Sequence, residues 1–138
     1  MQSPATPAPG DILIRTVSGD GSIAVRAVVA TGLVGEAALR HGTSPTATAA
    51  LGRTLMGAVL MAAEAGAEET LQIQLRGDGP LGAVTVIADS EGCVRGFVGD
   101  PAADLPSRAG KLDVGGAVGR GLLAVVRNHP SWREPYSG

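Results

Sequence analysis

The chain has 138 residues and a formal net charge of -2, and its eleven basic residues are scattered along its length. This balance gives no electrostatic case for a nucleic-acid partner, and the length suits one domain rather than two. Only Phe97, Trp132 and Tyr136 are aromatic, so the core must be aliphatic and no platform for base stacking is available.

The N-terminus and the cysteine usage bear on the cellular compartment. Residues 1–10, MQSPATPAPG, have neither the basic nor the apolar region of a secretory signal and are predicted to form a mobile tail. Cys93 is the only cysteine, which excludes an internal disulfide and a cysteine-pair zinc site in this chain. We expect Cys93 to be a small apolar residue in a strand. Because the sequence shows neither an export signal nor a disulfide pair, the cytoplasm is the expected compartment.

A β-hairpin and a short helix are predicted first. Residues 11–17 and 23–30 flank the turn-rich segment Ser18-Gly19-Asp20-Gly21-Ser22, which is typical of a hairpin. Apolar residues of the second strand alternate, so they fall on one face: Ile23, Val25, Ala27 and Val29. Helical spacing of Val34, Ala37, Ala38 and His41 then predicts an amphipathic helix that ends at Gly42.

A second, buried helix is predicted from Pro45 to about residue 65. Ser44-Pro45 is a strong helix start, and the second half of the helix has almost no polar face. A membrane span is excluded because ten uncharged residues separate Arg53 from Glu64, about half of the roughly twenty needed. Gly52 and Gly57 predict that another element packs close to this helix.

Residues 71–98 predict a β-meander. Leu71, Ile73 and Leu75 alternate with polar residues, which is the period of a strand with one buried face. The next run, 81–88, is apolar at successive positions, so it is expected to be a central strand covered on both faces. Residues 93–98 are predicted to form the third strand.

Three local motifs suggest chemistry that their context rejects. Gly77, Gly79 and Gly82 match the dinucleotide pattern GxGxxG, but a proline and a strand follow where a helix is needed. Ser90 has the outline of a nucleophile elbow but lies between two strands, so it is expected to be a turn residue. The Gly-rich segment 114–119 lacks the Gly-Lys-Ser/Thr ending of a phosphate loop and is expected to be a flexible strand entry.

No catalytic, cofactor-binding or metal site follows from these residues. His41 and His129 have no second ligand at metal spacing, and no nucleophile is paired with a base. Residues 100–112 are predicted to be a loop and residues 118–126 a further strand, after which no element completes the layer. The sequence therefore predicts an α+β fold in a single domain that is incomplete at its C-terminus.

The order of elements and several strings resemble the N-terminal domain of the heat-shock protein 33 family, the redox-regulated holdase also called the 33 kDa chaperonin. The resemblance covers residues 11–138 and is carried by the following strings: Val25-Arg26, Arg40-His41, Ser44-Pro45, Ala50-Leu51-Gly52-Arg53, Gly79-Pro80-Leu81-Gly82, Ala88-Asp89, Gly92, Val94-Arg95-Gly96-Phe97-Val98 and Glu134-Pro135-Tyr136 with Gly138.

The resemblance implies an ATP-independent chaperone that binds unfolded client proteins and responds to oxidative stress. In that family a C-terminal module with four cysteines binds zinc and acts as the redox switch. None of those cysteines is in this chain, since Cys93 matches no switch position. We therefore expect a fragment truncated before the switch, with no redox-switch residue and no zinc ligand.

Two rival functions follow. As a holdase domain, the chain would bind clients through an exposed apolar patch and need no catalytic group, so it would not be an enzyme. Alternatively, it is a folded assembly or dimerisation fragment that holds no clients, and a homodimer is then the expected partner. Client contacts depend on the folded surface, so the sequence assigns no client-binding residue.

Overall fold

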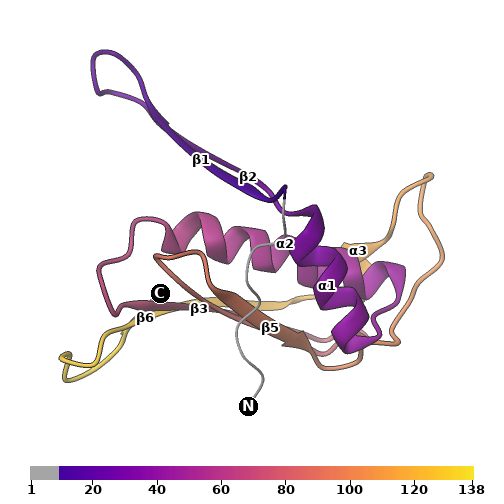
Figure 1. Ribbon diagram of the computed structural model, residues 1–138. Coiled ribbons are helices and arrows are strands. Elements are labelled where there is room, and N and C mark those ends of the chain that lie inside the picture. Colours follow the sequence, from indigo (N-terminus) through magenta and orange to yellow (C-terminus); the bar gives the residue numbers. More distant parts are fainter. Residues whose placement is uncertain (1–9) are drawn as a thin grey trace.

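The computed structural model describes residues 10–138, so the predicted tail lies outside the described residues except for Gly10. It is an α+β fold, as expected, with a hairpin, three helices and a sheet (Figure 1). The elements are β1 (Ile12–Val17), β2 (Ala24–Val29), α1 (Thr31–His41), α2 (Pro45–Ala62), β3 (Thr70–Gly77), β4 (Ala83–Asp89), β5 (Val94–Val98), α3 (Val114–Val118), β6 (Gly121–Asn128) and β7 (Tyr136–Ser137).

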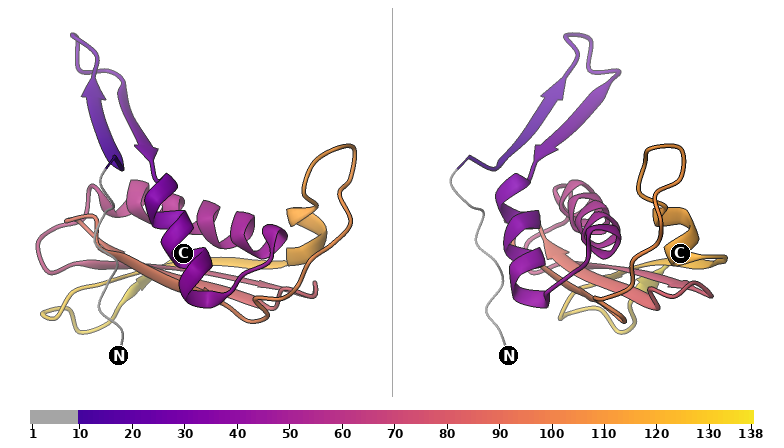
Figure 2. Two further views of the ribbon diagram at one scale, coloured as in Figure 1. Left: turned by 45° about the vertical axis from the view of Figure 1, so that its right-hand side comes forward. Right: turned by 90° about the vertical axis from the view of Figure 1, so that its right-hand side faces the viewer.

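The body of the molecule is a five-stranded sheet with helices on one face. Its strand order is β5-β4-β3-β6-β7, and every pair is antiparallel. The helix α2 lies across the sheet, and α1 lies beside it (Figure 2). The core forms between α2 and the alternating apolar residues of the strands, and its largest fully buried side chains are Leu51, Leu55, Leu81, Val84, Val86 and Val94.

Local signals explain where the two long helices begin and end. Gly42 follows α1 in the left-handed conformation at φ 59°, which suits glycine at a helix C-terminus. Ser44 caps α2, since its Oγ accepts the N–H of Ala47 at 3.1 Å. A Cβ added at Gly52 would lie 2.8 Å from the Val34 side chain, so the predicted close packing is confirmed there.

Two expectations about α2 need correction. Gly57 does not mark a close approach, since an added Cβ would make only an ordinary contact, 4.0 Å from Ile73 Cδ1. The helix is buried where it faces the sheet and α1, yet Met61 is 45% exposed. A single layer of strands covers only one side of a helix, so an apolar residue on the other side stays in contact with water.

The hairpin of β1 and β2 projects away from this body (Figure 1). Its tip is closed by Asp20, whose carboxylate accepts hydrogen bonds from the Ser18 and Ser22 side chains. Leu13 and Val28, a cross-strand pair at its root, pack against the core. The hairpin is therefore packed against the core at its root, while its tip projects from the body.

The expectation that the strand of residues 81–88 is covered on both faces was wrong. In β4, Val84 and Val86 are buried beneath α2, whereas Thr85 and Ile87 on the other face are only half-buried among neighbouring strands. No helix of residues 10–138 lies over that face (Figure 2). β-branched residues pack well against cross-strand neighbours, so an apolar run does not require two covering layers.

The Gly-rich segment 114–119 is not a strand entry. Val114–Val118 form the short helix α3, capped by Asp113, whose Oδ1 accepts the N–H of Gly116 at 2.9 Å. The strand β6 starts only at Gly121. The cap and contacts with α2 and β3 stabilise a segment whose glycines disfavour a helix.

The dinucleotide-like glycines have a packing role instead. No helix follows them, as expected, and a Cβ added at Gly77 would lie 1.9 Å from the carbonyl oxygen of Val118. Gly79 makes a similarly close approach to Ala117. These glycines let the β3–β4 turn lie against the end of α3.

The chain end also differs from the expectation that no element completes the layer. β7 pairs with β6 through Tyr136 and Ser137, and Val125 and Gly138 exchange two backbone hydrogen bonds of 2.8 and 2.9 Å. A two-residue strand gives almost no sequence signal, because its stability comes from the ladder it joins.

Candidate functional site

The side of the hairpin that faces away from α2 is the strongest candidate site. Antiparallel register places three cross-strand pairs there, Ile12 with Val29, Ile14 with Ala27 and Thr16 with Val25. We call these six residues the outer face. Its four large aliphatic side chains are between 50% and 54% exposed, and no residue on it is charged.

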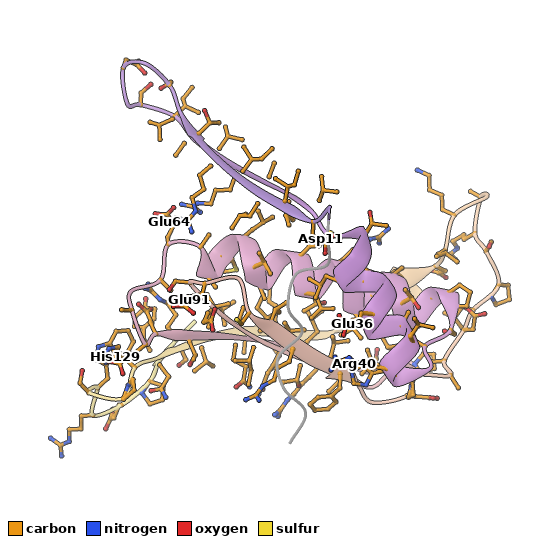
Figure 3. The ribbon with its side chains drawn as sticks, viewed as in Figure 1. Asp11, Glu36, Arg40, Glu64, Glu91 and His129 are labelled. Carbon is orange, nitrogen blue, oxygen red and sulfur yellow. The ribbon has the colours of Figure 1, made fainter. Side chains whose placement is uncertain are left out.

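The opposite side of the hairpin, its inner face, has a different character. Arg15 and Arg26 are cross-strand partners on it. The Nε of Arg26 lies 2.9 Å from Oε1 of Glu64, just past the end of α2. Nitrogen-bearing side chains of the hairpin accordingly lie on the side of Glu64 (Figure 3). This exposed ion pair is worth at most about 1 kcal/mol, but it orients the hairpin with its apolar side outward.

The outer face is energetically unusual. Exposed apolar surface costs about 25 cal/mol per Å² relative to burial. An isolated two-stranded hairpin is also at best marginally stable in water. Contiguous exposed apolar surface of this kind is typical of an interaction site, so the arrangement is suited to covering apolar surface on another molecule.

The uncovered face of the five-stranded sheet is a weaker candidate. Its central strand β3 presents Gln72, Gln74 and Arg76, the polar residues that the sequence placed opposite the buried ones. Phe97 and Leu122 are exposed on flanking strands, at 53% and 77%. Polar side chains separate these apolar residues, so the face is mixed.

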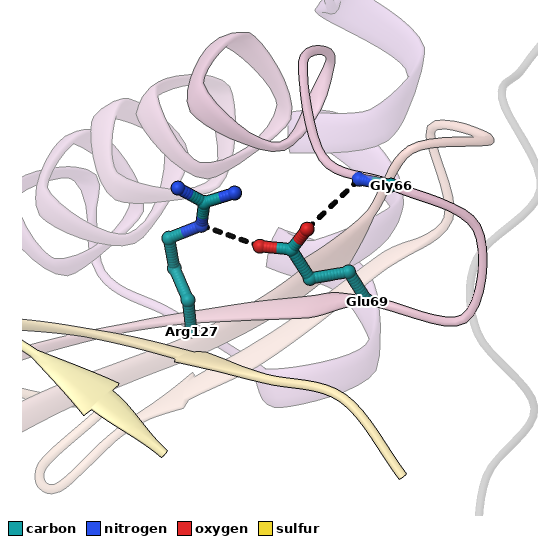
Figure 4. A network of polar contacts seen from close by, with 3 residues as sticks. All are labelled: Gly66, Glu69 and Arg127. Atoms are coloured by element: carbon teal, nitrogen blue, oxygen red, sulfur yellow. Dashed lines mark hydrogen bonds and ion pairs between the residues drawn. The ribbon is translucent and has the colours of Figure 1, made fainter. Parts of the chain in front are cut away.

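The most buried charged group serves the fold. Glu69 is 5% exposed and precedes β3, and its Oε1 accepts the Nε–H of Arg127 at 2.5 Å (Figure 4). Its Oε2 accepts the N–H of Gly66 at 2.9 Å. The hydrogen bond from Arg127 and that from Gly66 lower the pKa of Glu69, so its carboxylate is charged at neutral pH. This network fixes the α2–β3 connection onto β6 and leaves no carboxyl oxygen without a partner.

Catalytic and metal chemistry find no support in residues 10–138. No group of three or more His, Cys, Asp and Glu side chains there has the geometry of a metal site. Cys93 immediately precedes β5, and burial together with Asp89 and Glu91 raises the pKa of its thiol, which disfavours the reactive thiolate. Cys93 therefore does not fit the role of a zinc ligand in the switch that the resemblance implies for the family's C-terminal module. Ser90 lies in a turn, as expected.

The sequence already contained part of the candidate site. Alternation along residues 23–30 placed Val25, Ala27 and Val29 on one face. That this face remains uncovered depends on where α2 lies, which alternation does not specify.

Comparison with known proteins identifies the family. The family model described as "Hsp33 protein" matches residues 11–138. This chain belongs to the Hsp33 family. A 33 kDa chaperonin of Geobacter sulfurreducens is 45% identical over 128 residues, which cover 93% of this chain and 42% of that relative. One of Desulforamulus reducens is 46% identical over 129 residues, covering 93% of this chain and 44% of the relative.

A solved Hsp33 structure has the same fold. The 33 kDa chaperonin of Thermotoga maritima superposes with a TM-score of 0.85 at 35% identity, covering 90% of this chain and 43% of that one. The chain thus spans less than half the length of the relatives that it matches. Hsp33 proteins are chaperones, so the expectation of a non-enzymatic family is confirmed. Among the described residues, no helix combines the length and apolarity required to cross a bilayer.

Proposed function

We propose that this chain is the client-holding part of an ATP-independent holdase. The observation that carries the proposal is the outer face of the hairpin, an uncharged and aliphatic surface that no described element covers. Membership of the Hsp33 family, whose relatives are named 33 kDa chaperonin, supports a chaperone function.

The physical mechanism needs no reacting group. An unfolded client exposes apolar side chains, and contact with the outer face removes both apolar surfaces from water. The two free edges of the hairpin also offer N–H and C=O groups to an extended segment. Because this energy comes from surface burial, holding a client requires neither ATP nor a covalent step.

Control by oxidation forms a separate part of the proposal. We assign no redox or zinc role to Cys93, because its thiol pKa is raised and no ligand cluster surrounds it within the described residues. The redox switch and its zinc would then require cysteines other than Cys93, as the resemblance implies. We further propose that the protein acts in the cytoplasm, where a reversible thiol switch is kept reduced until stress.

Light scattering tests the holding function. A heat-unfolding client is incubated with and without this chain under fully reducing conditions, and circular dichroism verifies that the chain is folded. The proposal predicts that scattering falls as the amount of chain rises. Unchanged scattering with a folded chain would contradict it.

Assembly without client holding is the second candidate function. It is favoured by β5, which is an edge strand of the five-stranded sheet and has no described neighbour on its outer side. Unpaired edges promote strand pairing between copies. Sedimentation at several protein concentrations tests this alternative, which predicts a concentration-dependent mass together with unchanged client aggregation.

A further inference from the structure

A small apolar pocket lies at the root of the hairpin. Its walls are Leu13 and Val28 of the hairpin, Leu33 of α1 and Val59 of α2. The cavity has a volume of about 130 Å³. A cavity of about 150 Å³ with aliphatic walls holds a benzene molecule. The root pocket is close to this size, so it suits one large aliphatic side chain or one phenyl ring.

Contacts around the pocket keep its walls in place. Leu33 and Val59 are buried, each 6% exposed, and belong to the core. The carboxylate of Asp11 accepts the N–H groups of Gly32 and Leu33 at 2.9 and 2.8 Å, which fixes the start of the hairpin to the N-terminus of α1. The pocket is thus formed between two elements that are tied together.

The root pocket adjoins the outer face at the base of the hairpin. Ile12 and Val29 are cross-strand partners that line the pocket and also belong to the outer face. A segment with one side chain in the pocket would therefore also contact the outer face at its root, where Ile12 and Val29 lie.

Charge at the pocket selects among such segments. Its two ionisable lining residues, Asp11 and Glu91, are both acidic, and no basic side chain lines it. Glu91 lies in the exposed β4–β5 turn, where it can approach a ligand without being desolvated. A positive charge beside the bound apolar side chain would be attracted to this rim.

We propose that the root pocket binds one Leu, Ile or Phe side chain of an unfolded segment that carries Arg or Lys next to it. This inference rests on the proposed function, because the same unfolded segment would contact the outer face at Ile12 and Val29. It adds a sequence preference: clients are held at apolar residues flanked by basic ones.

The test is an NMR titration of the isotope-labelled chain with three peptides of equal length. One carries Leu between two Arg residues, one Leu between two Glu residues, and one Ser between two Arg residues. We expect the first to shift the amide signals of Leu33, Val59 and Gly92. At low salt it should bind about fivefold more tightly than the Glu-flanked peptide, and added salt should narrow the difference. The Ser peptide should leave the pocket signals in place.

A matched pair of variants separates the rim charge from the overall charge. Glu91→Arg reverses the charge at the pocket, and Glu134→Arg makes the same change in the exposed β6–β7 connection, which does not line the pocket. We expect Glu91→Arg to abolish the preference for the Arg-flanked peptide, and Glu134→Arg to change its affinity less than about twofold. Both positions are exposed, so both variants should fold, which circular dichroism verifies.

Three results would overturn the inference. The first is equal affinity for the Arg- and Glu-flanked peptides, and the second is equal affinity for the Leu and Ser peptides. The third is a change of the pocket signals with protein concentration instead of peptide concentration, which would indicate that a second copy of this chain occupies the pocket. Light scattering keeps the two proposals distinguishable. If the chain suppresses aggregation but no peptide shifts the pocket signals, the proposed holding function stands and the pocket proposal is wrong. If a peptide binds in the pocket but aggregation is not suppressed, the pocket proposal stands and the holding function is wrong.

Discussion

The outer face of the hairpin and the buried face of the five-stranded sheet are made of the same kinds of residue but have opposite environments. Both alternate Val, Ile and Leu with a period of two along antiparallel strands. The helix α2 covers the sheet, so Val84 and Val86 are fully buried, whereas Ile14 and Val25 are about half exposed. Alternation therefore specifies which residues share a face, while the neighbouring element decides whether that face is buried in the core or stays exposed to water.

The largest effect on stability is expected from the covered face. Leu55 of α2 is 1% exposed and packs against the sheet. Leu55→Ala leaves a cavity there and should lower the free energy of unfolding by about 2–5 kcal/mol, measured by urea denaturation. A loss below about 1 kcal/mol would mean that α2 is not packed as described.

Two glycines, one in a packed turn and one in the exposed hairpin tip, should differ in the stability cost of an added methyl group. Gly77→Ala should cost about 1–3 kcal/mol, because the new methyl would overlap the carbonyl of Val118 and move α3. In the hairpin tip, Gly19 has no atom within 4 Å of an added Cβ, so Gly19→Ala should change stability by less than about 0.5 kcal/mol. Equal costs, measured by urea denaturation, would contradict the close approach of α3 to the β3–β4 turn.

Substitutions on the outer face of the hairpin should reduce binding to apolar surfaces more than they reduce stability. Replacing both Ile14 and Val25 by Ser removes two half-exposed side chains and should lower the free energy of unfolding by about 2 kcal/mol or less, since strand propensity spans about 1 kcal/mol at each position. Binding of a dye that fluoresces on apolar surfaces should nevertheless fall clearly. Phe97→Ser is the matched control, since Phe97 is 53% exposed on the mixed face, and it should retain most of the dye binding. A larger loss of dye binding in Phe97→Ser than in the double variant would show that the principal exposed apolar surface lies on the sheet.

Local signals made much of the fold predictable. Ser44-Pro45 fixed the start of α2, and Gly42 fixed the end of α1, because caps depend on adjacent residues. The short helix α3 escaped prediction because its two glycines disfavour a helix, which the Asp113 cap and contacts with α2 and β3 stabilise. Tertiary contacts of this kind leave no periodic pattern.

The candidate site was predictable in composition only. Alternation placed Val25 and Val29 on one face, but whether that face is covered depends on distant residues, such as the partnership of Arg26 with Glu64. The root pocket was not predicted, because its walls come from four elements and the turn residue Glu91 joins them only in the folded chain.

The smallest effect concerns the hairpin tip. Hydrogen bonds from the Ser18 side chain and from Ser22 lower the pKa of Asp20 from 3.8 to about 2. A lowered pKa means that the contribution of Asp20 to stability is complete above its unfolded value and is lost as the pH falls through about 2. An NMR titration of the Asp20 carboxyl should give a midpoint near 2, and Ser18→Ala should raise that midpoint. A wild-type midpoint near 3.8 would show that Ser18 and Ser22 do not hydrogen-bond the Asp20 carboxylate in solution.

The claim that the outer face holds unfolded clients is tested most directly by light scattering with variants of matched exposure. A heat-unfolding client is incubated under reducing conditions with the wild-type chain, with the Ile14→Ser/Val25→Ser variant, or with Phe97→Ser, each verified as folded by circular dichroism. If the outer face holds clients, the wild type and Phe97→Ser suppress aggregation and the double variant largely fails to do so. Equal suppression by the folded double variant and the wild type would show that the outer face does not hold the client.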